Sequence, residues 1–215
     1  MRFRDRQEAG QVLAASLAHF TGRDDVVVLG LPRGGVPVAA EVARALGAPL
    51  DTLVVRKLGV PGHEELAMGA IASGGVRVLD ETSQAMYGIP DAAIERVTAD
   101  ESFELARRER LYRLGRPALE VKGRTVILVD DGLATGSTMR AAVRAVRERG
   151  AVRVVVAVPV APPDSCALLR HEADDCVCAA LHDPFFSVGA WYDDFAQTTD
   201  AEVQDLLRPG AAPRS

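Results

Sequence analysis

The sequence predicts an α/β fold, in which a Rossmann-like parallel sheet carries helices on both faces and the chain ends form a small hood. Short, almost wholly apolar runs alternate with segments of helical periodicity. Such strands are typical of a parallel sheet that is buried on both faces. The 215 residues suffice for one domain, with a core at about 23–182 and a hood from about 1–22 and 183–208.

The elements predicted in the first half are a helix at 1–22, a strand at 25–30, a helix at 36–47 and a strand at 49–57. Gly59, Pro61 and Gly62 then break the chain into a loop. The later elements are strands at about 69–73 and 76–79, a helix at 81–116 broken near 88–90, a strand at 124–130, a helix at about 138–149, a strand at 151–160, a helix at 162–170, a strand at 175–181 and a short helix near 200–207.

The composition is that of an ordinary soluble globular protein, with 48% hydrophobic and 26% charged residues. A net charge of −5 argues against a general nucleic-acid coat. The start, MRFRDRQEAG, lacks the apolar stretch of a secretory signal, and the longest apolar run, 154–161, is too short to cross a bilayer. We therefore expect a cytoplasmic protein without membrane or nucleic-acid partners.

Three cysteines, Cys166, Cys176 and Cys178, do not form a disulfide framework. A zinc site with His171 and His182 is an alternative. We expect the two thiols of the predicted strand 175–181 to point to opposite faces, which argues against zinc. The cysteines are therefore predicted to pack in the core as small apolar residues.

Three polar loops, at 30–35, 56–65 and 130–138, follow predicted strands. In parallel sheets, ligands bind at the carboxyl ends of the strands. The three loops are therefore predicted to share one site.

The stretch TVILVDDGLATGSTM, from Thr125 to Met139, carries the strongest signal for a ligand. It contains neither a Walker A loop nor a dinucleotide fingerprint. Backbone N–H groups at a helix N-terminus and nearby hydroxyls suit a monophosphate, which we expect to contact Ala134, Thr135, Gly136, Ser137 and Thr138. Asp130 and Asp131 would accept hydrogen bonds from vicinal ribose hydroxyls, directly or through a metal. A capped strand-to-helix turn is the plainer alternative.

The turn LPRGG is a second, weaker anion signal. Arg33 brings a permanent positive charge, and Gly34 and Gly35 permit close approach of the backbone. A strand-to-helix turn without a ligand would have the same sequence pattern. Because this segment is expected to lie near the first loop, we predict that it binds pyrophosphate.

These residues resemble a known family. VILVDDGLATGSTM is similar to the phosphoribosyl pyrophosphate (PRPP) motif of the type I phosphoribosyltransferases, and its wording is closest to that of the adenine enzymes. The loop positions extend the resemblance over roughly 25–195. The whole chain also resembles a bacterial subgroup of predicted phosphoribosyltransferases whose acceptor is not established.

The resemblance implies the type I phosphoribosyltransferase fold and a role for each motif. Asp130 and Asp131 would hold the ribose and approach a metal indirectly, and 134–138 would hold the 5-phosphate. PRGG matches the pyrophosphate loop, in which a non-proline cis peptide is frequent, here Pro32–Arg33. VVRKLGVPGHEE resembles the mobile catalytic loop of the orotate enzymes, which implies that Arg56 and Lys57 lie near pyrophosphate and that His63 and Glu64 lie on a lid.

FFSVGAWYDD resembles a segment of the hypoxanthine-guanine enzymes. By that match, Phe186 would stack on the base and Asp193 would reach Mg²⁺ through water, whereas packing of these aromatics is the alternative. The acid that faces the base in those enzymes is replaced here by Ala134. A general acid would therefore come from Glu64 or Glu65, or not be needed.

The implied reaction is transfer of the 5-phosphoribosyl group from PRPP to a nitrogenous acceptor of nucleobase type, with release of pyrophosphate and with Mg²⁺ as cofactor. The alternative is a PRPP-binding regulator that binds nucleic acid with little turnover, for which the arginine-rich segment 107–116 is the support. A third possibility is a phosphohydrolase that uses the acid pair to bind metals. The sequence does not support it, because it has no histidine-rich group of metal ligands. The oligomeric state is left open, a homodimer being compatible with the resemblance.

Overall fold

The structure of the chain is a computed structural model that describes residues 1–208, apart from the side chains of residues 65 and 81–83. Its centre is a five-stranded parallel sheet in the order β2-β1-β6-β7-β8. The strands are β1 (Val26–Gly30), β2 (Leu50–Thr52), β6 (Thr125–Val129), β7 (Arg153–Ala161) and β8 (Asp175–Leu181). This sheet confirms the predicted α/β fold.

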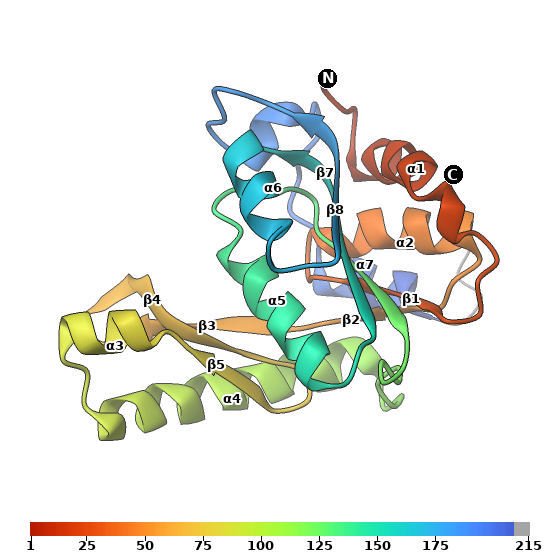
Figure 1. Ribbon diagram of the computed structural model, residues 1–215. Helices are drawn as coiled ribbons and strands as arrows, with labels where there is room; N and C mark the ends of the chain where they lie inside the picture. Colours follow the sequence, from red (N-terminus) through yellow and green to blue (C-terminus); the bar gives the residue numbers. More distant parts are fainter. Residues whose placement is uncertain (209–215) are drawn as a thin grey trace.

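Helices cover both faces of the sheet (Figure 1). They are α1 (Arg6–Ser16) and α2 (Gly35–Leu46) on one face, and α5 (Ser137–Glu148) and α6 (Pro163–Leu169) on the other. Val26 packs against the first pair of helices, whereas its neighbour Val27 packs against the second pair. Because successive side chains of each strand enter different cores, the strands are apolar throughout.

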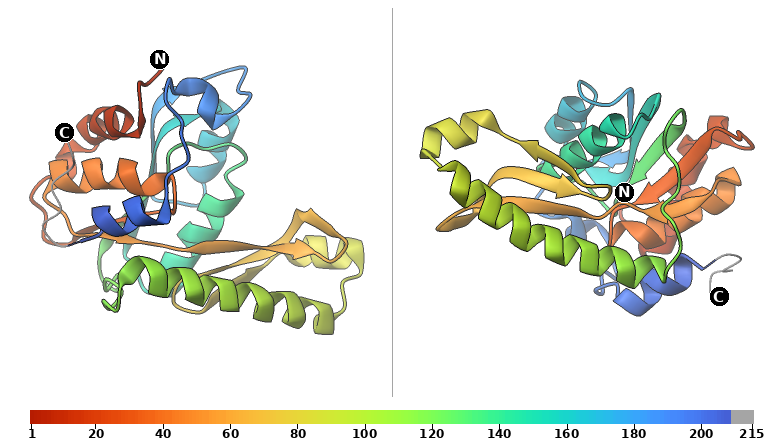
Figure 2. Two further views of the ribbon diagram at one scale, coloured as in Figure 1. Left: turned by 180° about the vertical axis from the view of Figure 1, so that it is seen from behind. Right: turned by 90° about the horizontal axis from the view of Figure 1, so that it is seen from below.

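A second, antiparallel sheet of three strands stands beside the first. It consists of β3 (Val55–Val60), β4 (His63–Ala72) and β5 (Val76–Leu79). Two helices follow it, α3 (Glu81–Tyr87) and α4 (Asp91–Arg113), and α4 runs along this sheet (Figure 2). Leu58 and Met68 of the sheet pack against Ile94 of α4.

This second sheet corrects two predictions. The single strand predicted at 49–57 is wrong, because the chain leaves the core sheet after Thr52 and pairs with β4 from Val55 onward. The predicted loop is also wrong, since Gly59 lies in β3 at a register shift and only a tight turn near Gly62, with φ 80°, separates β3 from β4. The lid predicted at 56–65 is therefore a β-hairpin.

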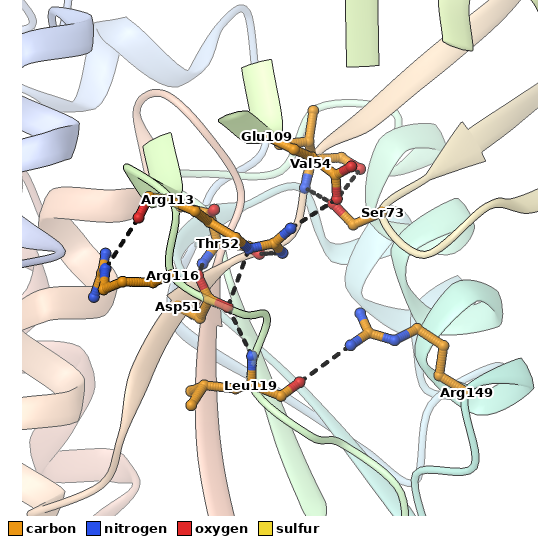
Figure 3. Close-up of polar contacts among 9 residues, drawn as sticks. All are labelled: Asp51, Thr52, Val54, Ser73, Glu109, Arg113, Arg116, Leu119 and Arg149. Atoms are coloured by element: carbon orange, nitrogen blue, oxygen red, sulfur yellow. Dashed lines mark hydrogen bonds and ion pairs between the residues drawn. The ribbon is translucent and has the colours of Figure 1, made fainter. Parts of the chain in front are cut away.

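Polar contacts join the two sheets where β2 ends (Figure 3). Asp51 is buried and accepts hydrogen bonds from the backbone N–H of Thr52 at 2.8 Å and of Leu119 at 3.0 Å. The guanidinium of Arg113, at the end of α4, lies 3.5 Å from Asp51 and pairs with Glu109 at 2.9 Å. A buried carboxylate thus ties α4 to the edge of the core sheet.

The first residues of the chain lie beside the segment around Tyr192, next to the core sheet. The first residues are extended rather than helical, because Phe3 pairs with Tyr192 and the side chain of Asp5 caps α1 at the N–H of Glu8. The short elements here are two 3₁₀ helices (Ala18–Phe20 and Val188–Trp191) and α7 (Asp200–Leu206). Within residues 1–208, no helix has the length and apolar character needed to cross a membrane.

Candidate functional site

The acid pair lies directly against the glycine pair of the LPRGG turn. Both segments follow neighbouring strands, β6 and β1. A Cβ atom built on Gly34 would lie 2.0 Å from Oδ2 of Asp131, and one on Gly35 would lie 2.9 Å from Oδ1 of Asp130. The two loops therefore meet so closely that only glycine fits at either position.

The electrostatics of the acid pair are unfavourable without a ligand. Burial and the neighbouring charge of Asp131 raise the pKa of Asp130 well above its usual range. Burial also raises the pKa of Asp131, although the guanidinium of Arg6 offsets part of the effect. Two adjacent carboxylates of this kind suit a ligand that brings hydroxyl donors or a cation.

Arg6, at the start of α1, is the residue of this site that sequence reasoning missed. Its Nε and a terminal nitrogen lie 2.9 and 2.8 Å from Oδ2 of Asp131. The same guanidinium donates to the backbone oxygen of Ala196 at 2.7 Å and lies 4.0 Å from the centre of the Phe195 ring. No pattern in the charged first residues of the chain indicates that one of their arginines contacts Asp131 in the loop after β6.

The segment 134–138 forms the turn into α5. Gly136 has a φ of 77°, which favours glycine, and the first turn of the helix presents N–H groups without helical partners. The hydroxyls of Thr135 and Ser137 lie 3.3 Å apart, and Ala134 accepts a 2.5 Å hydrogen bond at its backbone oxygen from Ser165 of α6. This geometry suits a phosphate group.

Arg33 is positioned by the C-terminal part of the chain. The peptide bond between Pro32 and Arg33 is cis, as the resemblance predicted. The Arg33 guanidinium lies 3.9 Å from the carboxylate of Asp200 on α7. Asp200 also accepts a 2.8 Å hydrogen bond from Tyr112 of α4, whose pKa burial and Asp200 raise to about 12.

The predicted lid residues divide between the two faces of the second sheet. Lys57 lines a cavity of about 350 Å³ between this sheet and α5, together with Ser137 and Thr138. Arg56 instead pairs with Glu101 of α4 at 2.6 Å. Arg56 and Glu64 line a separate hollow against α4, and Lys57 borders this hollow as well.

His63 begins β4, and the side chain of residue 65 lies outside the described structure. Lys57 thus borders both the cavity that Ser137 and Thr138 line and the hollow at α4, whereas Glu64 borders the hollow at α4.

The residues of the C-terminal hood segment differ in exposure and in the contacts that they make. Phe186 is 86% exposed, whereas Phe185 and Trp191 are partly buried and pack with Phe3. Asp193 forms an exposed pair with Arg2 at 2.8 Å. Tyr192, which the motif comparison did not single out, donates a 2.5 Å hydrogen bond to the backbone oxygen of Asp131.

The cysteines correct a prediction. Cys176 and Cys178 lie on the same face of β8, with their sulfurs 3.8 Å apart, because residues two apart in a strand share a face. Cys178 is bonded to Cys166 in a disulfide, and burial raises the pKa of the free thiol of Cys176 to about 11. The expectation of opposite faces was wrong. Cys166 and Cys176 are buried in the core, as predicted, and the single disulfide was not predicted.

Comparisons with known proteins show what this chain is similar to. A family model described as a phosphoribosyl transferase domain matches residues 7–194. A Mycobacterium tuberculosis protein provisionally named a phosphoribosyl transferase is 50% identical over 205 residues, which cover 95% of this chain and 46% of the relative. The chain thus spans about half the length of that relative.

Two further proteins extend the comparison. TT1426 from Thermus thermophilus, known from a crystal structure, shares 47% identity with a TM-score of 0.85 over 96% of this chain and 98% of that one. A ribose-phosphate pyrophosphokinase of Mycobacterium leprae is 35% identical over 102 residues, 46% of this chain and 29% of its own length.

Proposed function

Because the chain belongs to the family of phosphoribosyl transferase domains, we propose that it moves the 5-phosphoribosyl group of PRPP to a nitrogenous acceptor of nucleobase type. The observation that carries the proposal is the contact between the acid pair and the glycine pair. Gly34 lies against Asp131 and Gly35 against Asp130. A sugar bound at the acids would therefore have its C1 substituent near the LPRGG turn.

The ligand would lie across three segments. The 5-phosphate would sit on the turn 134–138 at the start of α5, whose free N–H groups and hydroxyls suit an anion. The ribose hydroxyls would donate to Asp130 and Asp131. The pyrophosphate would lie against Gly34 and Gly35 beside the charge of Arg33.

In the proposed reaction, the bond from C1 to the pyrophosphate oxygen breaks and a bond from C1 to the acceptor nitrogen forms. The acceptor then loses a proton. Negative charge grows on the leaving pyrophosphate, so fixed cations aimed at it are the largest source of rate enhancement. Arg33 and Lys57 are the side chains that we propose for this role, with Arg56 as a further candidate if its pair with Glu101 opens.

The residues fit Mg²⁺ as a cofactor. Hard carboxylate and substrate oxygens are its preferred ligands, and a cation would relieve the repulsion that raises the pKa of Asp130. When bound, Mg²⁺ neutralises part of the charge of pyrophosphate. Asp130 and Asp131 would hold it through ribose hydroxyls or water, and Asp193 would take part through water only after leaving Arg2.

The acceptor would bind between the hairpin and the hood. Ala134 offers no acid to the base, so Glu64 and His63 would have to approach from the hairpin, and Phe186 is exposed enough to stack on an incoming ring. These roles are proposed from the family resemblance. They do not select one acceptor.

The alternative is a PRPP-binding regulator that binds nucleic acid. Against it, three arginines of α4 are engaged in ion pairs within the chain. Arg107 and Arg108 both pair with Glu104, at 2.7 and 2.8 Å, and Arg113 pairs with Glu109. An arginine face neutralised in this way is a weaker phosphate-backbone binder than the sequence suggested.

The test is calorimetric titration of PRPP with Mg²⁺ into wild type, Asp130→Asn/Asp131→Asn and the surface control Asp24→Asn/Asp91→Asn. We expect micromolar binding in wild type and control, and at least tenfold weaker binding in the acid-pair variant. Pyrophosphate release with a panel of nucleobases and amines then tests transfer. Absence of PRPP binding to folded wild type overturns the proposal, and binding without turnover together with salt-dependent RNA binding supports the regulator instead.

A further inference from the structure

All three cysteines of the chain converge outside the site described above. Cys176 and Cys178 belong to β8, and Cys166 lies opposite them on α6. The sulfur of Cys176 is 3.5 Å from that of Cys166 and 3.8 Å from that of Cys178. All three sulfurs lie within 4.8 Å of one another. Since the sequence has only 3 cysteines, every cysteine sulfur of this chain lies in the cluster.

The cluster sits in the core between α6 and the sheet. Cys166 and Cys176 are buried among apolar side chains such as Val156 and Leu169. Cys178 is partly exposed, so the cluster reaches solvent on one side. The cluster is therefore enclosed on most sides, with Cys178 as its most exposed member.

The two sulfur separations made by Cys176 match those of a metal–thiolate site, whereas the bonded pair Cys166 and Cys178 would have to separate on reduction. A tetrahedral zinc–sulfur bond of about 2.3 Å sets neighbouring sulfurs about 3.8 Å apart. The two separations made by Cys176 are 3.5 and 3.8 Å. Soft thiolate sulfur selects zinc and related thiophilic cations over Mg²⁺ or Ca²⁺.

The disulfide between Cys166 and Cys178 must be reduced before such an ion can bind. A dithiol or phosphine reductant supplies two electrons, water or the dithiol supplies two protons, and the bond becomes two thiols. The cation then replaces the thiol protons, which pass to the buffer. Reoxidation of the pair removes two of the three ligands.

We propose that the reduced thiols of Cys166, Cys176 and Cys178 bind one thiophilic divalent cation of the zinc class. The bound ion would tie α6 to β8. Ser165, next to Cys166 on α6, also holds the phosphate loop through its 2.5 Å hydrogen bond to Ala134. A metal at the cluster would therefore stiffen the support of the candidate site without touching its ligand.

The test uses the full chain, reduced with a phosphine that is then removed without oxygen. Titration with Cd²⁺ is followed by the ultraviolet thiolate-to-cadmium absorption band and by calorimetry, and is repeated with Zn²⁺. We expect one Cd²⁺ per chain. Each variant Cys166→Ser, Cys176→Ser or Cys178→Ser should bind more than about a hundredfold more weakly, since outer partners of metal ligands alone contribute about 10–100-fold.

Val177→Ala is the matched control, because Val177 lies between the two cysteines of β8 but packs in the opposite core. It should bind Cd²⁺ as wild type does. The melting temperature should rise with Cd²⁺ in wild type and Val177→Ala, but not in Cys178→Ser, the least buried of the three positions.

Three results overturn the proposal: no Cd²⁺ or Zn²⁺ bound by folded protein with three titratable thiols, binding that survives the serine variants, or a disulfide that resists reduction in the folded protein. None of these measurements involves PRPP. Failure here is therefore distinct from failure of the proposed function.

Discussion

Arg6 forms a hydrogen-bonded ion pair with the carboxylate of Asp131, which lies 125 residues away in the sequence. Both side chains are nearly buried, with 12% and 15% of their surface exposed. The hood helix α1 thus begins beside the acid pair that we propose for the ribose, and the guanidinium of its first residue is ion-paired with Asp131. The charge of a hood residue therefore influences the protonation of the acid pair.

Replacing Arg6 by Gln should weaken PRPP binding, with a dependence on pH. Burial raises the pKa of Asp131, and Arg6 offsets part of that rise. Without Arg6, a larger fraction of Asp131 is therefore protonated near neutral pH. We expect about tenfold weaker binding at pH 6.5, equivalent to about 1.4 kcal/mol, and a smaller loss at pH 8.5. Calorimetric titration with PRPP and Mg²⁺ measures both.

Arg23→Gln serves as the control, because Arg23 forms an exposed pair with Asp25 and neither residue is placed in the site. Exposed pairs of this kind contribute little. Equal or tighter PRPP binding by Arg6→Gln at both pH values would show instead that Arg6 competes with the ribose.

Asp130→Asn should make the ligand-free protein more stable while weakening ligand binding. Burial and Asp131 raise the pKa of Asp130, so the folded state holds the proton more tightly than the unfolded chain does. That stabilisation is complete at low pH and is lost as the pH rises from the ordinary carboxyl value through the raised one. Asn keeps the acceptor for the N–H of Asp131 and never ionises.

Thermal unfolding from pH 5 to pH 8 tests this expectation. At pH 8 the melting temperature of Asp130→Asn should exceed that of wild type by about 2–4 °C, or about 1 kcal/mol for a chain of this size, and the gap should close toward pH 5. Asp193→Asn, at an exposed acid, should show no such gain. A variant that melts below wild type at pH 8 contradicts the argument.

The core of the fold was predictable because its signals are local. The strand DCVCAAL was predicted at 175–181 and is observed there, since an apolar run between polar segments specifies a buried parallel strand. The division of 49–57 was not predictable from such signals. Leu50 and Leu58 are both apolar, and only the pairing partner, β1 or β4, decides which sheet each one joins.

The site was predictable in its motifs but not in its long-range partners. Asp131 and Gly34 each stand in a recognisable turn, and their approach follows from the meeting of adjacent strand ends. Arg6 and Asp200 reach those turns from the hood, and no local pattern marks such pairings. The same holds for Cys166, which belongs to a different element from the other two cysteines.

Gly34→Ala should disrupt the contact between the two loops. The backbone of Gly34 has an ordinary helical conformation, with φ −64°, so the effect is steric: the new Cβ would overlap Oδ2 of Asp131. Overpacking of this kind costs about 1–3 kcal/mol, and PRPP binding should be lost.

The double variant Gly34→Ala/Asp131→Ala isolates the cause, because the shorter side chain removes the overlap. Its free energy of unfolding, measured by urea titration, should match that of Asp131→Ala alone rather than the sum of the two single changes. Additive losses would show that the alanine acts on the backbone and not on the carboxylate.

Asp51→Asn should destabilise the joint between the sheets without altering residues that we place in the site. Arg113 is only 12% exposed and faces this carboxylate (Figure 3), and Arg149, whose pKa burial and Arg113 lower, lies nearby. Removing the charge leaves two enclosed guanidinium groups with less compensation, for which we expect a loss of about 2–4 kcal/mol. Glu95→Gln, which breaks an exposed pair with Arg77, should cost less than about 1 kcal/mol. Urea unfolding measures both, and equal losses in the two variants would contradict the role given to Asp51.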